Sequence, residues 1–138
     1  MIQLIYTSDF AQSLQVEDFE KIIKTALAKN ISLEITGMMV IIDGHIFQAI
    51  EGPEHNVLSL MESIKNDSRH KNVRIIGVDS IVTRDYPDWA MGYTSTWQGT
   101  TLDDVKSLLL QLSEKSTFSE NHAQSLKMLM RSLRPELT

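Results

Sequence analysis

The sequence has no cysteine, which excludes disulfide bonds, a thiol nucleophile and a cysteine-ligated metal centre. Its four histidines do not have the spacing of metal ligands. A glycine-rich phosphate loop and a Gly-x-Ser-x-Gly motif are also missing. Metal binding, nucleotide hydrolysis and serine hydrolase chemistry therefore have no support in the sequence.

Long hydrophobic runs are absent as well, since no apolar stretch approaches the roughly 18–20 residues of a membrane-spanning helix. The first residues, Met1-Ile2-Gln3-Leu4, show neither the basic region nor the cleavage site of an export signal. Positive charge is scarce too, with 13 Lys and Arg against 18 Asp and Glu and no dense basic cluster. Because nucleic-acid binders usually have a basic face, we expect a cytoplasmic protein that contacts neither a membrane nor nucleic acid directly.

The chain does have the length and apolar content of one folded domain, with 138 residues of which 42% are hydrophobic. Ile2 to Ser8 alternates in the manner of a strand, which places Tyr6 and Ser8 on one face. Asn30 follows the next segment, where we expect a helix to stop. The apolar residues of that helix have a spacing of i, i+3, i+4, i+7 and i+8: Phe19, Ile22, Ile23, Ala26 and Leu27.

A β-hairpin is expected next, because Asp43-Gly44 is a strong signal for a two-residue turn between apolar strands. That turn pairs Ile41 with Ile46 and Met39 with Gln48. The opposite face of the hairpin is also apolar, so both faces must be covered. Its residues are Met38, Val40, Ile42, Phe47 and Ala49.

The rest of the first hundred residues completes an α+β pattern. Pro53 is placed to open a second helix, and strands are expected over Val73–Thr83 and Ala90–Trp97. The apolar residues expected on the buried face of that helix are Val57, Leu60, Met61 and Ile64. The order predicts a ferredoxin-like βαββαβ fold with an added fifth strand and two helices on one sheet face.

The C-terminal part is expected to form two more helices on or near the other sheet face. Gly99 is the one plausible boundary, which divides the chain into residues 1–97 and 98–138. The apolar positions of these helices are Leu102, Val105, Leu108, Leu109 and Leu112, then Ala123, Leu126, Leu129, Met130 and Leu133.

One side chain does not fit an ordinary core. The amide of Gln48 lies in the middle of an apolar strand, where burial without partners costs on the order of 1–3 kcal/mol. Either the protein or a ligand must therefore supply a hydrogen-bond partner for this amide. Each of the other polar residues has an ordinary structural explanation when it is considered alone. Tyr6 could be a core tyrosine with its hydroxyl at the edge, Asn30 could end a helix, and Arg69-His70 could be solvent-exposed residues after a helix.

Taken together, these residues form a set with a definite order and spacing. The set is Tyr6-Thr7-Ser8, Asn30, Ile35-Thr36-Gly37, Phe47-Gln48-x-x-Glu51-Gly52-Pro53, Arg69-His70 and Tyr86-Pro87-Asp88-Trp89-x-Met91-Gly92. In that arrangement, residues 1–97 resemble the BLUF family of blue-light sensors.

The resemblance implies a non-covalent FAD held between the first two helices above the sheet. It assigns Asn30 to the C4=O/N3–H edge of the flavin, and Tyr6 and Gln48 to a chain that reaches N5 and O4. The other cofactor-binding residues it implies are Ile22 and Ile64 on the ring faces, Arg69 and His70 near the ring and ribityl side, Trp89 and Met91 on the last strand, and Ser8 and Asp67.

The resemblance also implies a photoreceptor without catalytic turnover. Light drives electron and proton transfer from Tyr6, after which the Gln48 amide rotates or tautomerises and donates to O4. The last strand then relays the change to the C-terminal helices and to a downstream protein partner, and similarity to stand-alone members implies a homo-oligomer. A flavin-dependent oxidoreductase and a cofactor-free ferredoxin-like interaction module remain as alternatives.

Overall fold

The computed structural model describes residues 1–10, 16–42, 44–88, 92–94, 107 and 109–132. The elements are β1 (Ile2–Phe10), α1 (Val16–Ser32), β2 (Thr36–Ile42), β3 (His45–Gly52), α2 (Glu54–Lys65), β4 (His70–Ser80), β5 (Gly92–Thr94) and α4 (Glu120–Ser132). Ser107 and residues 109–113 are also helical. The strands form one sheet in the order β4-β1-β3-β2-β5. This arrangement confirms the α+β fold with an added fifth strand.

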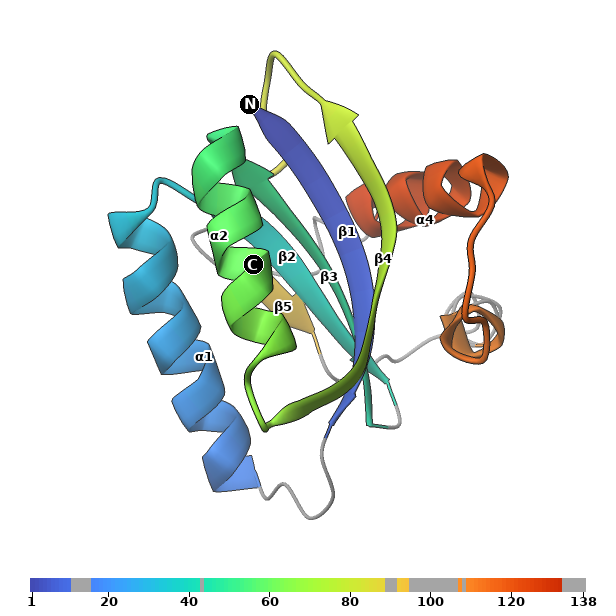
Figure 1. The fold of residues 1–138 in the computed structure, drawn as a ribbon, viewed down its shortest axis with the longest axis horizontal. Helices are drawn as coiled ribbons and strands as arrows, with labels where there is room; N and C mark the ends of the chain where they lie inside the picture. Colours follow the sequence, from blue (N-terminus) through green and yellow to red (C-terminus); the bar gives the residue numbers. More distant parts are fainter. Residues whose placement is uncertain (11–15, 43, 89–91, 95–106, 108, 133–138) are drawn as a thin grey trace.

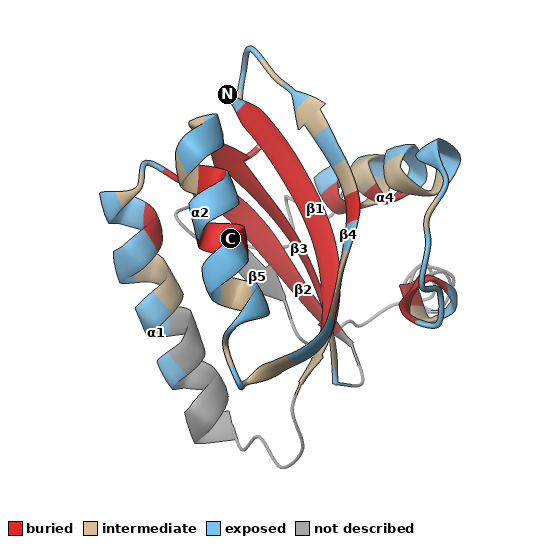
Figure 2. Cartoon of the chain, viewed as in Figure 1, coloured by how far each residue is buried: buried red, intermediate tan, exposed pale blue. Residues whose placement is uncertain are grey.

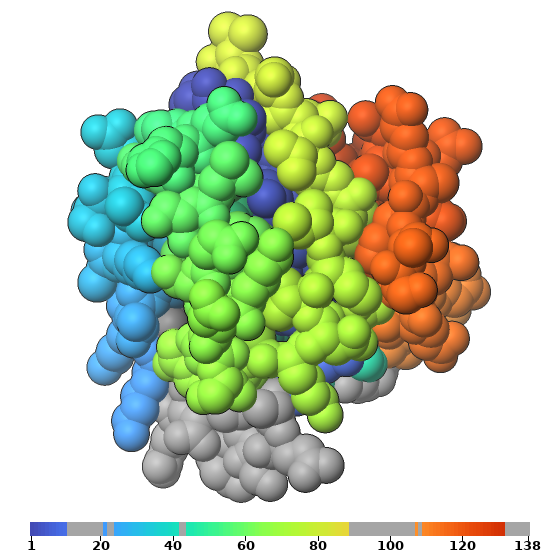
Figure 3. Space-filling view, in the orientation of Figure 1, coloured from blue at the N-terminus to red at the C-terminus, as the bar shows by residue number. Residues whose placement is uncertain are grey.

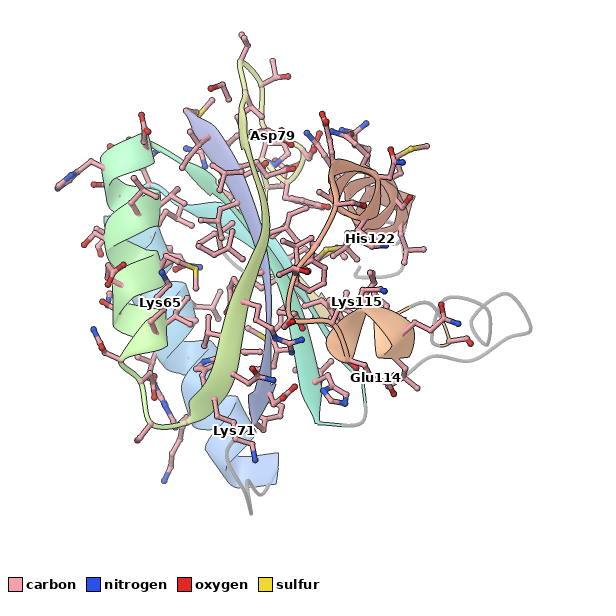
Figure 4. All side chains as sticks on the ribbon, turned by 45° about the vertical axis from the view of Figure 1, so that its right-hand side comes forward. Lys65, Lys71, Asp79, Glu114, Lys115 and His122 are labelled. Carbon is pink, nitrogen blue, oxygen red and sulfur yellow. The ribbon has the colours of Figure 1, made fainter. Side chains whose placement is uncertain are left out.

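The molecule has three layers. Figure 1 shows α1 and α2 side by side on one face of the sheet, while α4 lies beyond β4 on the other face. The side-on view of Figure 4 shows the same separation, with Lys65 on α2 and His122 on α4 at opposite sides of the sheet. The sheet therefore has two covered faces, as the doubly apolar hairpin requires.

The hairpin has the predicted register. Ile41 pairs with Ile46, Met39 pairs with Gln48, and Ile42 and His45 close the connection. Gly44 has a φ of +81°, a conformation that a two-residue hairpin turn demands and glycine adopts without strain. Pairing of Ile42 with His45 confirms the two-residue connection.

Each face of the sheet has its own hydrophobic core. The first core lies toward α2 and contains Ile2, Leu4, Tyr6, Ile35, Met39, Ile41, Ile46, Ile50, Val57, Leu60 and Met61. The second core joins Met38, Val40, Phe47 and Ala49 of the hairpin to Leu109, Leu112, Leu126 and Met130. In Figure 2 the central strands are buried along almost their whole length. The C-terminal helices thus cover the second face, as expected.

Several predicted boundaries were wrong. The first helix continues to Ser32, so Asn30 lies inside its last turn rather than after it. The backbone carbonyl of Asn30 accepts from the N–H groups of Leu33 and Ile35, and Glu34 has the positive φ that ends the helix. The strand predicted over Val73–Thr83 is β4, which begins at His70 and ends at Ser80. Its pairing with β1 runs from His70 opposite Phe10 to Ser80 opposite Ile2. The predicted strand Ala90–Trp97 and the boundary at Gly99 lie mostly outside the described residues.

Among the residues that the structure describes, no helix has the length and apolar character needed to cross a membrane. The same residues contain no group of three His, Asp or Glu side chains arranged to hold a metal ion.

Candidate flavin site

A pocket lies where α1 and α2 approach the sheet. It brings together seven of the residues singled out from the sequence: Tyr6, Asn30, Gln48, Ile64, Asp67, Arg69 and His70. They come from β1, α1, β3, α2, the loop after α2 and the start of β4, and the fold makes them neighbours. The backbone of Ile22 lies in α1, but its side chain, like Trp89 and Met91, falls outside the described part.

The floor of the pocket is a pair of buried polar side chains on adjacent strands. Tyr6 and Gln48 are directly opposite each other in the antiparallel pairing of β1 with β3. The phenol Oη of Tyr6 donates a hydrogen bond to Oε1 of Gln48. Both residues are almost completely shielded from solvent. The protein itself therefore supplies one partner for the amide that the sequence marked as anomalous.

The environment of Tyr6 keeps its phenol protonated. Burial raises the pKa of Tyr6 well above the ordinary value, because the phenolate would lose its hydration, and the negative charge of Asp67 raises it further. A phenol in this state is a hydrogen-bond donor and retains a proton that it can give up.

The rim of the pocket is a bidentate ion pair. Arg69 Nη2 lies 2.6 Å from Asp67 Oδ2, and Arg69 Nε lies 3.0 Å from Asp67 Oδ1. The backbone N–H of Arg69 also donates to Oδ1, at 2.9 Å. These hydrogen bonds lower the pKa of Asp67 to about 2, so the carboxylate is ionised beside the pocket.

A second polar pair lies next to this rim. Ser8 Oγ and His70 Nδ1 are 2.9 Å apart. Desolvation lowers the pKa of His70 below its ordinary value, which favours the neutral imidazole. Arg69 and His70 are both half-buried. Ser8 contacts His70 but is not among the residues that line the pocket.

Six more side chains line the pocket that the sequence analysis did not assign to it: Thr25, Ala26, Lys29, Met39, Leu60 and Ser63. Ala26 and Leu60 belong to the predicted apolar faces of their helices, and Met39 is the hairpin partner of Gln48. The sequence pattern could therefore have indicated that these three residues lie near the site. Thr25, Lys29 and Ser63 are polar helix residues, and nothing in the neighbouring sequence indicates that they line a pocket. They reach it because α1 lies close to α2.

The chemistry of this lining fits a flavin ring. The ring edge offers acceptors at N5 and O4 and a donor at N3–H, and the amides of Asn30 and Gln48 supply both kinds of group. Ile64, Leu60, Ala26 and Met39 provide apolar surface for a planar aromatic system. The lining thus combines an apolar surface with several polar and charged side chains, a combination that suits a cofactor with an apolar ring and a polar edge.

Comparison with known proteins agrees with this chemistry. The family model of BLUF, sensors of blue-light using FAD, matches residues 1–92. The chain belongs to the BLUF family. This BLUF chain accordingly binds a flavin and senses blue light.

Relatives of this BLUF chain include larger proteins. It is 28% identical to the photoactivated adenylate cyclase subunit beta of Euglena longa over 123 residues, which cover 88% of the chain and 14% of that protein. A bacterial light-regulated adenylyl cyclase has a similar structure, with a TM-score of 0.76, 28% identity and coverage of 94% of the chain and 36% of the cyclase. The dark-state structure of the BLUF protein BlrB gives a TM-score of 0.67 at 28% identity, with 80% of both chains covered. The BLUF chain thus spans 14% of the Euglena cyclase subunit, 36% of the bacterial cyclase chain and 80% of BlrB.

Proposed function

We propose that this chain binds FAD between α1 and α2 and acts as a light-driven switch at the Tyr6–Gln48 hydrogen bond. The observation that carries the proposal is that bond itself, a buried phenol–amide contact at the floor of a pocket that Asn30 also lines. A structural core does not need a donor and an acceptor in that position.

The residues of the pocket have separate tasks in this proposal. Asn30 and Gln48 present amides to the polar edge of the ring, and Ile64 packs on one ring face. Ile22, from α1, is proposed for the other face, and Trp89 and Met91 for the edge near the last strand. Arg69 is held by Asp67, and His70 by Ser8, at the side where the ribityl chain would leave.

Bound flavin supplies absorption of blue light and an excited state that accepts an electron and a proton. Tyr6 is the proposed donor of both, because its phenol is buried, protonated and already aligned with Gln48. The Gln48 amide then rotates or tautomerises, which exchanges the end that faces Tyr6. The electron and the proton return to Tyr6, so that no net oxidation or reduction remains. Both arrangements keep the amide hydrogen-bonded, and that allows two states in a buried site.

The switch makes no product, and we propose that the chain is not an enzyme. Its output is proposed to pass from a sensor part, residues 1–97, to an output part, residues 98–138, and from there to a protein partner. Two of the three similar proteins named above are adenylate cyclases, and the third is the BLUF protein BlrB. Homo-oligomerisation and a cytoplasmic location stay predictions from the sequence.

An absorption spectrum taken before and after blue light tests the proposal. Full-length protein loaded with FAD should show a small, reversible red shift, and the flavin extracted from protein expressed in cells should be FAD rather than FMN. Steady oxidation of a nicotinamide without illumination would instead support the flavin oxidoreductase.

Replacement of the amide isolates its part in the switch. Gln48→Leu should keep the flavin bound but abolish the red shift, because no group remains that can exchange donor and acceptor. Met39→Leu is the matched control, since Met39 is opposite Gln48 on β2, lines the same pocket and changes little in volume. A normal red shift in Gln48→Leu would refute the role given to Gln48.

A further inference from the structure

Glu51 is a buried carboxylate on β3 that the flavin site does not use. It is completely shielded from solvent. Its Oε1 accepts from Thr36 Oγ1 at 3.2 Å and from the backbone N–H of Tyr86 at 2.6 Å. Its Oε2 accepts from Gln3 Nε2 and from the backbone N–H of Asp85, both at 3.0 Å. Four donors compensate the loss of hydration that would otherwise make this site costly.

Glu51 and Gln48 lie on opposite faces of the same strand. Side chains alternate along a strand, so residues three apart point to opposite sides. Gln48 faces the pocket under α1 and α2, where Tyr6 belongs to the first core. Glu51 bonds Tyr86, whose side chain belongs to the second core with Leu126 and Met130 of α4. Strand β3 thus connects the photoactive face to the face that α4 covers.

A short chain of bonds continues from Glu51 to α4. Gln3 Nε2 also donates to Asp85 Oδ2, at 2.8 Å, so one amide bridges the two carboxylates. Asp85 Oδ2 in turn accepts from Arg131 Nη2 of α4, at 3.1 Å. The loop that follows β4 is tied to β3 at two backbone N–H groups and to α4 through its first acidic side chain.

We propose that Glu51, Gln3 and Asp85 are positioning residues that couple β3 to α4, so that a shift of β3 at Gln48 reaches α4 through Arg131. This inference rests on the proposed function, because it needs light to displace β3. Because Glu51 accepts from the backbone N–H groups of Asp85 and Tyr86, a movement of β3 should move the loop after β4. The Asp85–Arg131 contact should then transmit this movement to α4.

A second ion pair of α4 provides a matched control. Lys127 Nζ lies 3.5 Å from Asp79 Oδ2, on β4 rather than on the loop. Figure 4 shows Asp79 on the part of β4 nearest to α4, and the surface view of Figure 3 shows α4 directly beside β4. Arg131 and Asp79 are exposed to a similar extent, 48% and 43%. Arg131→Gln and Asp79→Asn therefore each remove one half-exposed ion pair of α4. The first also removes a hydrogen bond to Asp85, whereas both variants keep Lys127, whose charge acts on Asp85 as well.

The experiment measures hydrogen exchange in full-length protein loaded with FAD, in the dark and under blue light, together with the red shift. Arg131→Gln should keep the red shift and lose most of the light-dependent change in exchange over residues 120–132. Arg131→Lys should restore that change because it retains a cation near Asp85, and Asp79→Asn should leave it as in the wild type. A wild-type change in Arg131→Gln, an equal loss in Asp79→Asn, or no change in a wild type that shows the red shift would overturn the inference.

The dark state separates this inference from the proposed function. In Arg131→Gln the backbone amides of Asp85 and Tyr86 should exchange roughly two- to fivefold faster, the factor expected for one exposed ion pair. Asp79→Asn should not change them. Unaltered exchange at both amides in Arg131→Gln overturns the coupling whatever the light response. Absence of a red shift in the wild type overturns the proposed function and the light-driven part of this inference, and faster dark exchange in Arg131→Gln would still support the contact between the loop and α4.

Discussion

Tyr6 and Gln48 show how little local sequence is needed to mark a site. A glutamine in the middle of an apolar strand demands a partner, and the partner is the tyrosine directly opposite on β1. The strand pattern placed Tyr6 on one face of its strand, and the family resemblance implied that Tyr6 and Gln48 both reach a flavin held between the helices. It did not predict that the phenol would be the donor, since β1 and β3 are separated by a helix and another strand.

At this scale, removal of the Tyr6 hydroxyl should affect both stability and photochemistry. Tyr6→Phe removes the buried hydrogen bond that Tyr6 donates to Oε1 of Gln48, and this loss should cost about 1–3 kcal/mol of unfolding free energy. The same variant should bind flavin but show no red shift, because the proton donor is gone. Urea unfolding and a light-minus-dark spectrum measure the two effects.

Tyr86→Phe is the control for that experiment. Tyr86 is also buried, but it belongs to the second core on the α4 face. Its variant should keep the red shift. A red shift that persists in Tyr6→Phe would remove Tyr6 from the photochemical step.

Among the elements, the hairpin is the one whose geometry local sequence predicted best. Register and turn length both followed from Asp43-Gly44 and the alternation of apolar residues. The end of α1 was predicted less well. Its last turn depends on backbone bonds around Asn30 and on the positive φ of Glu34, and neither has a strong signal in residue type.

Close packing of β2 against β3 should make Gly37 intolerant of any side chain. A Cβ at this position would lie 2.1 Å from the backbone oxygen of Ala49, the residue next to Gln48. We expect Gly37→Ala to destabilise the protein by about 1–3 kcal/mol, since the two strands must separate. Urea unfolding measures the loss, and the absorption spectrum reports any change around the flavin.

Gly44→Ala is the comparison variant. A Cβ at Gly44 meets no atom within 4 Å, so its cost comes only from the positive φ and should be about 1–2 kcal/mol, with an unchanged spectrum. If Gly37→Ala unfolds at the wild-type urea concentration, the two strands do not have the close contact described here.

For the whole molecule, the C-terminal helices are part of the core rather than an appendage to it. Their side chains Leu109, Leu112, Leu126 and Met130 complete the second core. The sensor and output parts proposed above therefore share a buried interface. A signal can cross it only by altering packed contacts or by moving the polar links at its edge.

A chain that ends at Gln98 should expose the second sheet face. Without the helices, Met38, Val40, Phe47 and Ala49 would face water, and such a patch is prone to association. We expect binding of a hydrophobic dye and aggregation on gel filtration. A control chain that ends at Ser132 keeps α4 and should show neither. A chain ending at Gln98 that stays monomeric and binds no dye would contradict the arrangement.

The sequence by itself determined the order of elements, the register of the hairpin and the set of residues that marks the family. Each of these is written in local spacing, in the period of apolar residues or in a turn dipeptide. Only the tertiary structure decided that Asp67 influences Tyr6, that Glu51 holds the loop after β4, and that Asp85 meets Arg131. The hydrogen bonds of Glu51 to the loop and of Asp85 to Arg131 join residues 34 to 46 positions apart. They depend on how the sheet and helices pack, and residue spacing along the chain carries no record of that packing.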